Sequence, residues 1–177
     1  MAVRFGVVGT GNIGSQHIQL LNSGKVTGAT LAATASRSTP HLETGVPHFV
    51  DYRQMFSDAD INAVLIATPT MSHVEVAQAA LEHSLHVVME KPIAMSMHQA
   101  ETLLARVPDD LKFAVMLNQR FHPAYAKLKQ LLVDDAIGNL QRVGWTMTAW
   151  YRPDIYYQVS SWRGTWPGEG GGLLINQ

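Results

Sequence analysis

Short apolar runs alternate with segments of helical periodicity from the start of the chain to about residue 135. This alternation is typical of βαβ units on a parallel sheet. The apolar runs are nearly continuous, as expected of strands that helices cover on both faces. The predicted strands are Val3–Val8, Thr30–Ala35, Pro47–Val50, Ala63–Thr68, His86–Met89 and Lys112–Asn118. The sequence therefore predicts an α/β fold with a doubly wound parallel sheet.

Three predicted helices begin at residues with capping chemistry. Asp51, Ser72 and Ser96 each precede a Gln or Glu by three residues. A side-chain oxygen at the first position accepts a hydrogen bond from an early helical N–H, and the later side chain reaches back. We therefore expect helices to start at these residues.

The pattern changes after Gly138, where apolar and polar residues alternate over residues 139–151. Such alternation is typical of an antiparallel strand with one covered face. We assign residues 1–120 to a nucleotide-binding domain of the Rossmann type and residues 121–177 to the beginning of an α+β domain with an antiparallel sheet. A single strand is not a stable domain. The chain is therefore expected to be part of a longer architecture or to depend on a partner for its sheet.

A glycine-rich loop, Gly9–Gly14, lies between the first predicted strand and the following helix. In this pattern Gly9 permits a tight turn, Gly11 admits a pyrophosphate and Gly14 lets helix and strand pack closely. Asn12 and Ile13 begin the helix whose N–H groups would receive the anion. Although a purely structural turn is the alternative, the surrounding βαβ units favour a dinucleotide site.

The end of the second predicted strand bears on cofactor choice. An NAD site usually has an Asp or Glu about 20 residues after the glycines. Here Ser36 and Arg37 occupy the region, and the next acidic residue is Glu43. Arginine can hold a 2′-phosphate through charge-assisted hydrogen bonds. The sequence favours NADP(H) and leaves NAD(H) open, with a solvated loop arginine as the alternative for Arg37.

One further segment ends a predicted strand, and a histidine follows it in the next helix. Thr68 and Pro69 are placed to contact the middle of the cofactor. His73, in the first turn of the next helix, either faces the same crevice or is an ordinary exposed histidine.

Glu90-Lys91-Pro92 follows the strand His86–Met89, where open α/β sheets bind their ligands. An ordinary lysine has a pKa near 10.4, and burial beside a cofactor would lower this pKa toward the range useful for proton transfer. Lys91 is therefore the candidate catalytic residue. Glu90 is expected to orient the lysine or to pair with a group behind the site.

Together these motifs resemble the glucose-fructose oxidoreductase/inositol dehydrogenase/MocA (Gfo/Idh/MocA) family. The resemblance rests on motifs in a shared order: Gly9–Gly14, Asp51-Tyr52, Ala67-Thr68-Pro69, Glu90-Lys91-Pro92, Asn118-Gln119-Arg120-Phe121, Trp162-Arg163 and Gly170-Gly171-Gly172-Leu173-Leu174. It implies an NAD(P)-dependent oxidoreductase of sugars, inositols or related polyols that forms homo-oligomers through its second-domain sheet.

The resemblance also implies roles for particular residues. Lys91 is the catalytic lysine before a cis Pro92, Asn118 and Arg120 lie near the nicotinamide, and Trp162 and Arg163 contact cofactor or substrate. Trp162 as a core residue is the alternative. The active-site histidine of the family would follow the Gly-Gly-Gly-Leu-Leu segment, and it does not occur before Gln177. A non-catalytic NADP(H)-binding module or an inactive fragment is therefore the alternative to an enzyme.

Composition argues against several other classes of protein. The net charge of −1 has no basic runs, which argues against nucleic-acid binding. The absence of cysteine excludes disulfides and thiolate metal sites, and the eight histidines show no recognisable metal-ligand spacing. The first strand follows Met1 closely and no apolar stretch approaches the ~20 residues of a membrane span. We therefore expect a cytoplasmic protein that uses no metal.

Overall fold

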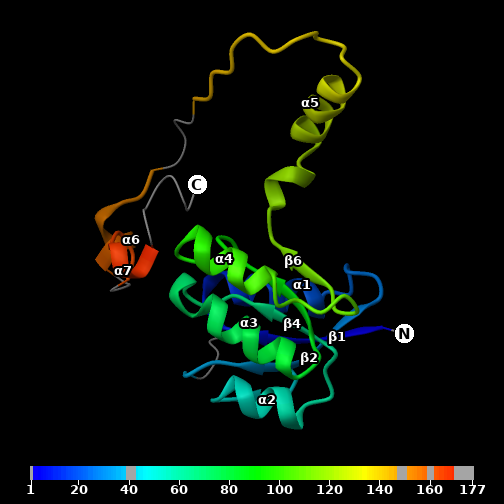
Figure 1. The fold of residues 1–177 in the computed structure, drawn as a ribbon. Helices are drawn as coiled ribbons and strands as arrows, with labels where there is room; N and C mark the ends of the chain where they lie inside the picture. The colour runs from blue at the N-terminus through cyan, green and yellow to red at the C-terminus, as the bar shows by residue number, and fades with distance from the viewer. Residues whose placement is uncertain (1, 39–42, 147–150, 159–161, 170–177) are drawn as a thin grey trace. The chain divides into compact units, whose positions relative to one another are not determined.

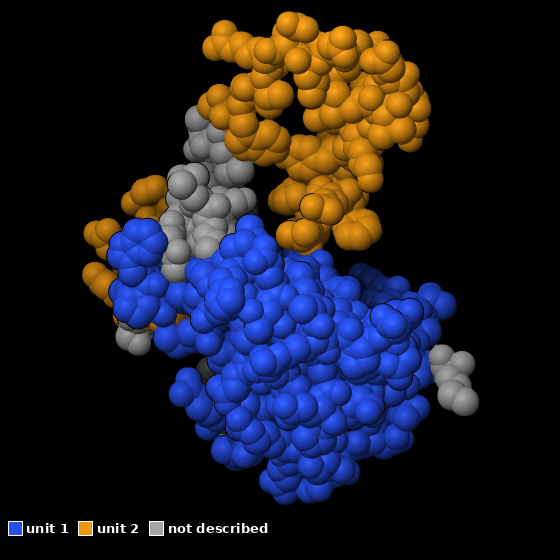
Figure 2. Space-filling view, viewed as in Figure 1, with its two compact units in different colours: residues 1–116, 164–177 blue, residues 117–163 orange. Residues whose placement is uncertain are grey.

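The computed structural model describes residues 2–38, 43–146, 151–158 and 162–169. The chain divides into two compact units, coloured separately in Figure 2. The first contains Met1–Met116 and Gly164–Gln177, and the second contains Leu117–Arg163. The first unit contains the parallel sheet. The expected assignment of residues 121–177 to a separate substrate domain stays a prediction.

The sheet has six parallel strands in the order β3-β2-β1-β4-β5-β6 (Figure 1). This is the strand order of the Rossmann fold, and it confirms the predicted fold class. The order reverses between β1 and β4, which makes the crevice beyond their carboxyl ends the expected ligand site. The strands are β1 Val3–Val8, β2 Ala29–Ala35, β3 His48–Phe49, β4 Ala63–Ile66, β5 His86–Met89 and β6 Phe113–Val115.

Helices cover both faces of this sheet. On one face, Ile18 and Leu21 of α1 (Asn12–Asn22) pack in a cluster with Val7, Leu31 and Leu65 of the strands. The other face carries α2 (Tyr52–Asp58), α3 (His73–Glu82) and α4 (Met97–Leu104). Their buried side chains include Met55, Phe56, Val76, Ala77, Ala80 and Leu103. Burial of each large apolar side chain contributes about 1.5–3 kcal/mol, so this packing holds the strand ends in place.

All three helices start where they were expected, but only two of the three predicted side-chain caps form. The Asp51 side chain accepts from the Arg53 N–H at 2.9 Å, and Ser96 Oγ accepts from the Gln99 N–H at 3.3 Å. The predicted Ser72 cap is wrong. A 3₁₀ turn, η1 (Thr70–Ser72), precedes α3, and Ser72 Oγ donates to the carbonyl oxygen of Pro69 at 2.9 Å. Ser72 has helical backbone angles, and its hydroxyl makes no capping bond to α3.

The second unit contains η2 (Asn118–Phe121), α5 (Pro123–Val133) and α6 (Asp154–Gln158), while α7 (Trp166–Glu169) belongs to the first unit. None of the described residues in the second unit is buried. Residues 139–146 form no strand, and residues 147–150 lie outside the described part of the chain. The predicted strand over 139–151 is therefore absent where it can be described, because strand formation requires a paired neighbour and the described residues supply none.

Within the described ranges, no helix combines the length and the apolar character needed to cross a membrane.

Candidate functional site

The glycine loop follows β1 at the point where the strand order reverses. Gly9 has φ of +93°, and a Cβ atom there would lie 2.6 Å from the carbonyl oxygen of Ala67 after β4. A Cβ on Gly14 would lie 1.8 Å from the carbonyl oxygen of Gly9. Gly11 is exposed, and its Cβ position has no atom within 4 Å. Two glycines therefore permit close backbone packing, and the third leaves open space that a ligand can approach.

The amino terminus of α1 faces this opening. The N-cap residue is Gly11, which has no side chain to cap the helix, and the first turn carries no acidic residue. The first helical hydrogen bond runs from the Ser15 N–H to the Gly11 carbonyl at 2.8 Å. The N–H groups of Asn12, Ile13 and Gly14 consequently lie outside the helical ladder and can receive an anionic group. This arrangement fits the pyrophosphate of a dinucleotide.

Ser36 connects the glycine loop to the end of β2. The hydroxyl oxygens of Thr10 and Ser36 lie 2.8 Å apart, and Ser36 Oγ donates to the Ser38 carbonyl at 2.5 Å. Arg37, the next residue, is exposed. The contacts bring the Ser36-Arg37 segment beside the loop, as an adenosine-ribose site requires.

The segment after β4 provides a threonine and a buried histidine. Thr68 Oγ1 is buried and has no hydrogen-bond partner among the described residues. A bound ribose or nicotinamide amide can supply such a partner. His73 is only 1% exposed, with Nδ1 2.7 Å from the Pro92 carbonyl oxygen and Nε2 2.9 Å from the Thr68 carbonyl oxygen. This burial corrects the expected cofactor contact of His73, because the backbone occupies both ring nitrogens.

Lys91 follows β5, the strand beside β4, and it is half-buried. The Lys91–Pro92 peptide bond is cis, as the resemblance implies. The preceding Glu90 carboxylate lies 2.8 Å from Nε2 of His17 on α1, and both side chains are mostly buried, at 19% and 12% exposed. Glu90 therefore pairs with a group behind the strand end, and a direct contact with cofactor stays a prediction.

The remaining predicted site residues belong to the second unit. Asn118 begins η2 and is exposed. Arg163 Nη1 donates to the Tyr156 hydroxyl, and its guanidinium lies 4.6 Å from the centre of the Trp162 ring. These contacts group Trp162 and Arg163 with Tyr156. Their roles beside a cofactor, and that of Asn118, stay predictions.

Sequence reasoning missed His17 and Thr10. His17 and its partner Glu90 are 73 residues apart, and Thr10 and Ser36 are 26 residues apart. Thr10 carries a weak signal, since it lies inside the glycine loop. No sequence signal distinguished His17, because its partner Glu90 follows β5, far along the chain from α1.

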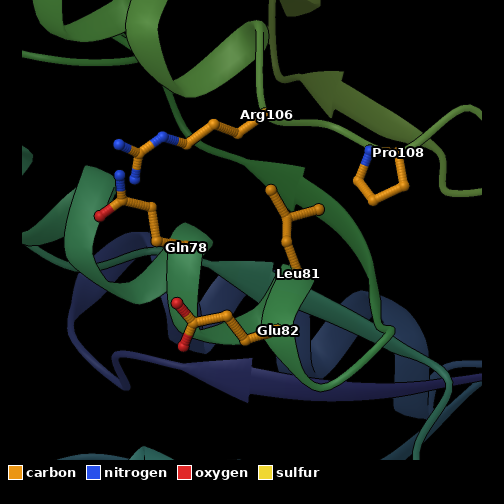
Figure 3. Close-up of a pocket in the computed structure, with 5 residues that line it drawn as sticks. All are labelled: Gln78, Leu81, Glu82, Arg106 and Pro108. Atoms are coloured by element: carbon orange, nitrogen blue, oxygen red, sulfur yellow. The ribbon is translucent and has the colours of Figure 1, made fainter.

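The structure also contains a separate cavity, whose lining residues are drawn in Figure 3. It is lined by Gln78, Leu81, Glu82, Arg106 and Pro108, from the carboxyl half of α3 and the loop after α4. Its volume of about 230 Å³ is below the range of about 300–1,000 Å³ typical of small-molecule sites. Because α3 runs back from the carboxyl edge of the sheet, this cavity lies toward the opposite edge. Within the described ranges, no group of three or more His, Asp or Glu residues could hold a metal ion.

A glycine loop at the switch point of a Rossmann sheet, with a lysine after β5, is the arrangement expected of a nucleotide-dependent oxidoreductase. The family model described as "Oxidoreductase family, NAD-binding Rossmann fold" matches residues 3–118. The chain belongs to this family, the Gfo/Idh/MocA oxidoreductases.

Several members resemble this chain. The inositol 2-dehydrogenase of Arthrobacter sp. (strain FB24) is 33% identical over 151 residues, which cover 78% of this chain and 43% of that protein. The scyllo-inositol dehydrogenase of Lactobacillus casei, solved with bound NAD(H) and scyllo-inositol, superposes with a TM-score of 0.72. That protein is 31% identical, with 78% of this chain and 43% of the solved chain covered.

The WlbA dehydrogenase of Bordetella pertussis, solved with NADH and UDP-GlcNAcA, has a TM-score of 0.84 and 26% identity. The match covers 100% of this chain and 56% of that one. The chain spans less than half the length of the curated relatives that it matches, at 40% and 43% for two of them.

Proposed function

We propose that the protein is an NAD(P)-dependent oxidoreductase that moves a hydride between the nicotinamide and a carbon of a sugar, inositol or related polyol. The observation that carries the proposal is the position of Lys91. It follows β5, next to the strand β4 that borders the crevice, and the glycine loop follows β1 on the other side of β4. A dinucleotide laid across the switch point extends from the loop toward this lysine.

The chain's own residues fit such a cofactor. The N–H groups at the start of α1 receive the pyrophosphate, and the open space at Gly11 lets it approach the backbone. Thr68 Oγ1 offers a buried hydroxyl that lacks a partner among the described residues. A bound nicotinamide supplies hydride donation and acceptance, which protein side chains cannot provide.

Lys91 handles the proton of the substrate oxygen in this proposal. When the substrate is an alcohol, the neutral amine accepts the hydroxyl proton as the carbon loses its hydride. In the reverse direction the ammonium returns a proton to the carbonyl oxygen.

The substrate class is proposed from the relatives. Their names include inositol dehydrogenases, and one solved relative contains scyllo-inositol. Inositols and sugars share a ring carbon with a hydroxyl group, which is the group a lysine-assisted dehydrogenase oxidises. Homo-oligomerisation through the second unit and a cytoplasmic location stay predictions from the sequence.

The proposed cofactor preference is NADP(H), with NAD(H) as the alternative. Ser36 lies beside the glycine loop and Arg37 is exposed, so the guanidinium can reach a 2′-phosphate. The two solved relatives described above contain NAD(H) or NADH, which supports the alternative. Both cofactors share the pyrophosphate site, and the choice between them rests on Arg37.

Calorimetric titration of the chain with NADPH and, separately, with NADH tests the cofactor site. Micromolar binding with a preference for NADPH supports the cofactor site and the role of Arg37, and a preference for NADH supports the site but rejects the role of Arg37. Production of reduced cofactor from a panel of inositols and sugars then tests the reaction. Binding without turnover on any of them supports the alternative of a non-catalytic binding module.

A further inference from the structure

Two histidines from different helices hold the residues on either side of Lys91. His17 of α1 contacts the side chain of Glu90, and His73 of α3 contacts the backbone carbonyl of Pro92. The three residues Glu90-Lys91-Pro92 are consecutive, so both anchors act on the peptide that carries the lysine. Neither histidine has a role in the proposed chemistry.

The contact with His17 fixes the Glu90 side chain. Nε2 of His17 and Oε1 of Glu90 are 2.8 Å apart, and the side chains are only 12% and 19% exposed. A carboxylate only accepts hydrogen bonds, so the imidazole donates. Because the carboxylate is mostly removed from water, loss of the donor leaves it unsatisfied and free to turn toward other partners.

The contact with His73 connects two strand ends. Its ring nitrogens lie 2.7 Å from the carbonyl oxygen of Pro92 and 2.9 Å from that of Thr68. Both oxygens only accept, so a neutral imidazole donates to one of them and an imidazolium donates to both. The ring occupies a fully buried position between the segment after β4 and the segment after β5. It therefore sets the spacing between Thr68 and the Lys91 peptide.

The backbone completes this arrangement, since the Glu90 N–H donates to the Ile66 carbonyl at 2.9 Å. We infer that His17 and His73 are positioning residues for Lys91, which hold its peptide against α1 and α3 and so direct its side chain into the crevice. A catalytic consequence of this positioning rests on the proposed function of Lys91. The positioning itself is a property of the protein without substrate or cofactor.

Nuclear magnetic resonance of the chain labelled with ¹³C in its lysine side chains tests the positioning directly. The chain has five lysines, so Lys91 can be assigned by the loss of its signal in Lys91→Arg. We expect His17→Leu and His73→Leu to shift the Lys91 signal while those of Lys25, Lys112, Lys127 and Lys129 stay in place. His17→Gln and His73→Gln retain a side-chain N–H donor, and they are expected to restore the Lys91 signal toward its original position.

His83→Gln is the matched control, because His83 is an exposed histidine at the opposite end of α3. A double-mutant cycle of His17→Leu with Glu90→Gln separates positioning from a general loss of folding. We expect His17→Leu to shift the Lys91 signal much less when Glu90→Gln is already present. An unchanged Lys91 signal in His17→Leu and His73→Leu would overturn the inference, and so would equal shifts at all five lysines. If the Leu variants do not fold, a Lys91 signal in Glu90→Gln identical to that of wild type has the same meaning.

Affinity for NADH provides a second measurement. We expect its Kd to rise about tenfold in His73→Leu, equivalent to about 1.4 kcal/mol, and to recover in His73→Gln. A shifted Lys91 signal in a wild type that binds neither NADPH nor NADH leaves the positioning intact and rejects the proposed function. An NADH site that tolerates the Leu variants, with an unshifted Lys91 signal, keeps the function and rejects the positioning.

Discussion

A Cβ atom on Gly14 would lie 1.8 Å from the carbonyl oxygen of Gly9, so the start of α1 touches the end of β1. Gly11, between them, has no atom within 4 Å of its Cβ position. The same loop therefore contains one glycine required by packing of the protein and one that leaves room for a ligand. These two positions can be distinguished by mutation.

Gly14→Ala is expected to destabilise the fold by about 3 kcal/mol, because the methyl group forces the backbone of the loop apart. Gly11→Ala is expected to cost less than about 1 kcal/mol of stability, and to weaken NADH binding at least tenfold by occupying the approach of the pyrophosphate. Thermal unfolding and calorimetric titration measure the two effects. Equal loss of stability in both variants would contradict the distinction.

Lys91→Met is expected to lower kcat at least a hundredfold, because methionine retains the bulk of the side chain but transfers no proton. Stability should change little, because Lys91 is only half-buried. The assay compares kcat with the melting temperature, using Lys112→Met as the control at an exposed position on the same unit. Unchanged kcat in Lys91→Met would reject the catalytic role.

Arg37→Ala is expected to raise the Kd for NADPH by tenfold or more, because hydrogen bonds to charged groups contribute about 1.5–3 kcal/mol. The Kd for NADH should stay within about twofold, since NADH lacks the 2′-phosphate. Arg106→Ala, at the cavity of Figure 3, is the matched control. A similar loss for both cofactors in Arg37→Ala would show that the guanidinium does not recognise the 2′-phosphate.

A carboxylate between α2 and α3 is expected to give a small acid-dependent contribution to stability. Arg53 Nη2 donates to Glu75 at 2.5 Å and the Tyr52 hydroxyl donates at 3.0 Å, and these bonds lower the pKa of the Glu75 carboxyl. Because the pKa of Glu75 is lower in the folded state, the ionised carboxylate stabilises the fold at pH values above its ordinary pKa of 4.5. This stabilisation is lost as the pH falls through the lowered pKa of the folded state. Because the Glu75 side chain is 63% exposed, the contribution should be below about 1 kcal/mol.

The melting temperature of Glu75→Gln should therefore lie slightly below that of wild type at neutral pH, with the difference closing below about pH 4. A gap that persists in acid would assign the effect to packing rather than charge.

The phenol of Tyr52 is expected to titrate late. Burial, followed by the hydrogen bond to Glu75, raises the pKa of Tyr52 to about 12 from 10.0. Because the pKa is higher in the folded state, Tyr52 contributes its full stabilisation of the fold at pH values below 10.0, the ordinary pKa. This stabilisation is lost as the pH rises through the pKa of the folded state, about 12. Ultraviolet titration of phenolate should therefore lose its highest-pH component in Tyr52→Phe. In Glu75→Gln that component should move to lower pH, and an unmoved component would reject the pairing.

The local pattern of the sequence predicted the parallel sheet well. The strands Val3–Val8 and His86–Met89 form at the predicted residues, because continuous apolar runs leave few other arrangements. The other strands were found with ends that differ by a few residues. For example, the last predicted strand was expected to end at Asn118, but β6 ends at Val115. Asn118 instead begins the 3₁₀ turn η2.

Long-range contacts account for the errors. The alternation over 139–151 predicted a strand, yet the described part of that segment has none, since alternation describes a face and pairing requires a neighbour. Ser72 has a capping residue's chemistry, but the turn before α3 directs its hydroxyl to Pro69. The sequence placed His73 near the crevice, and packing then buried it between two carbonyl groups.

The sequence by itself determined the order of strands and helices, the glycine loop, the motif around Lys91 and the family, because these depend on residue type and spacing along the chain. Only the tertiary structure decided how the strand ends are held. The pairing of His17 with Glu90 joins residues 73 positions apart, and His73 lies between carbonyl groups of two different strand ends. Such contacts depend on the packing of α1 and α3 against the sheet, and local sequence carries no record of that packing.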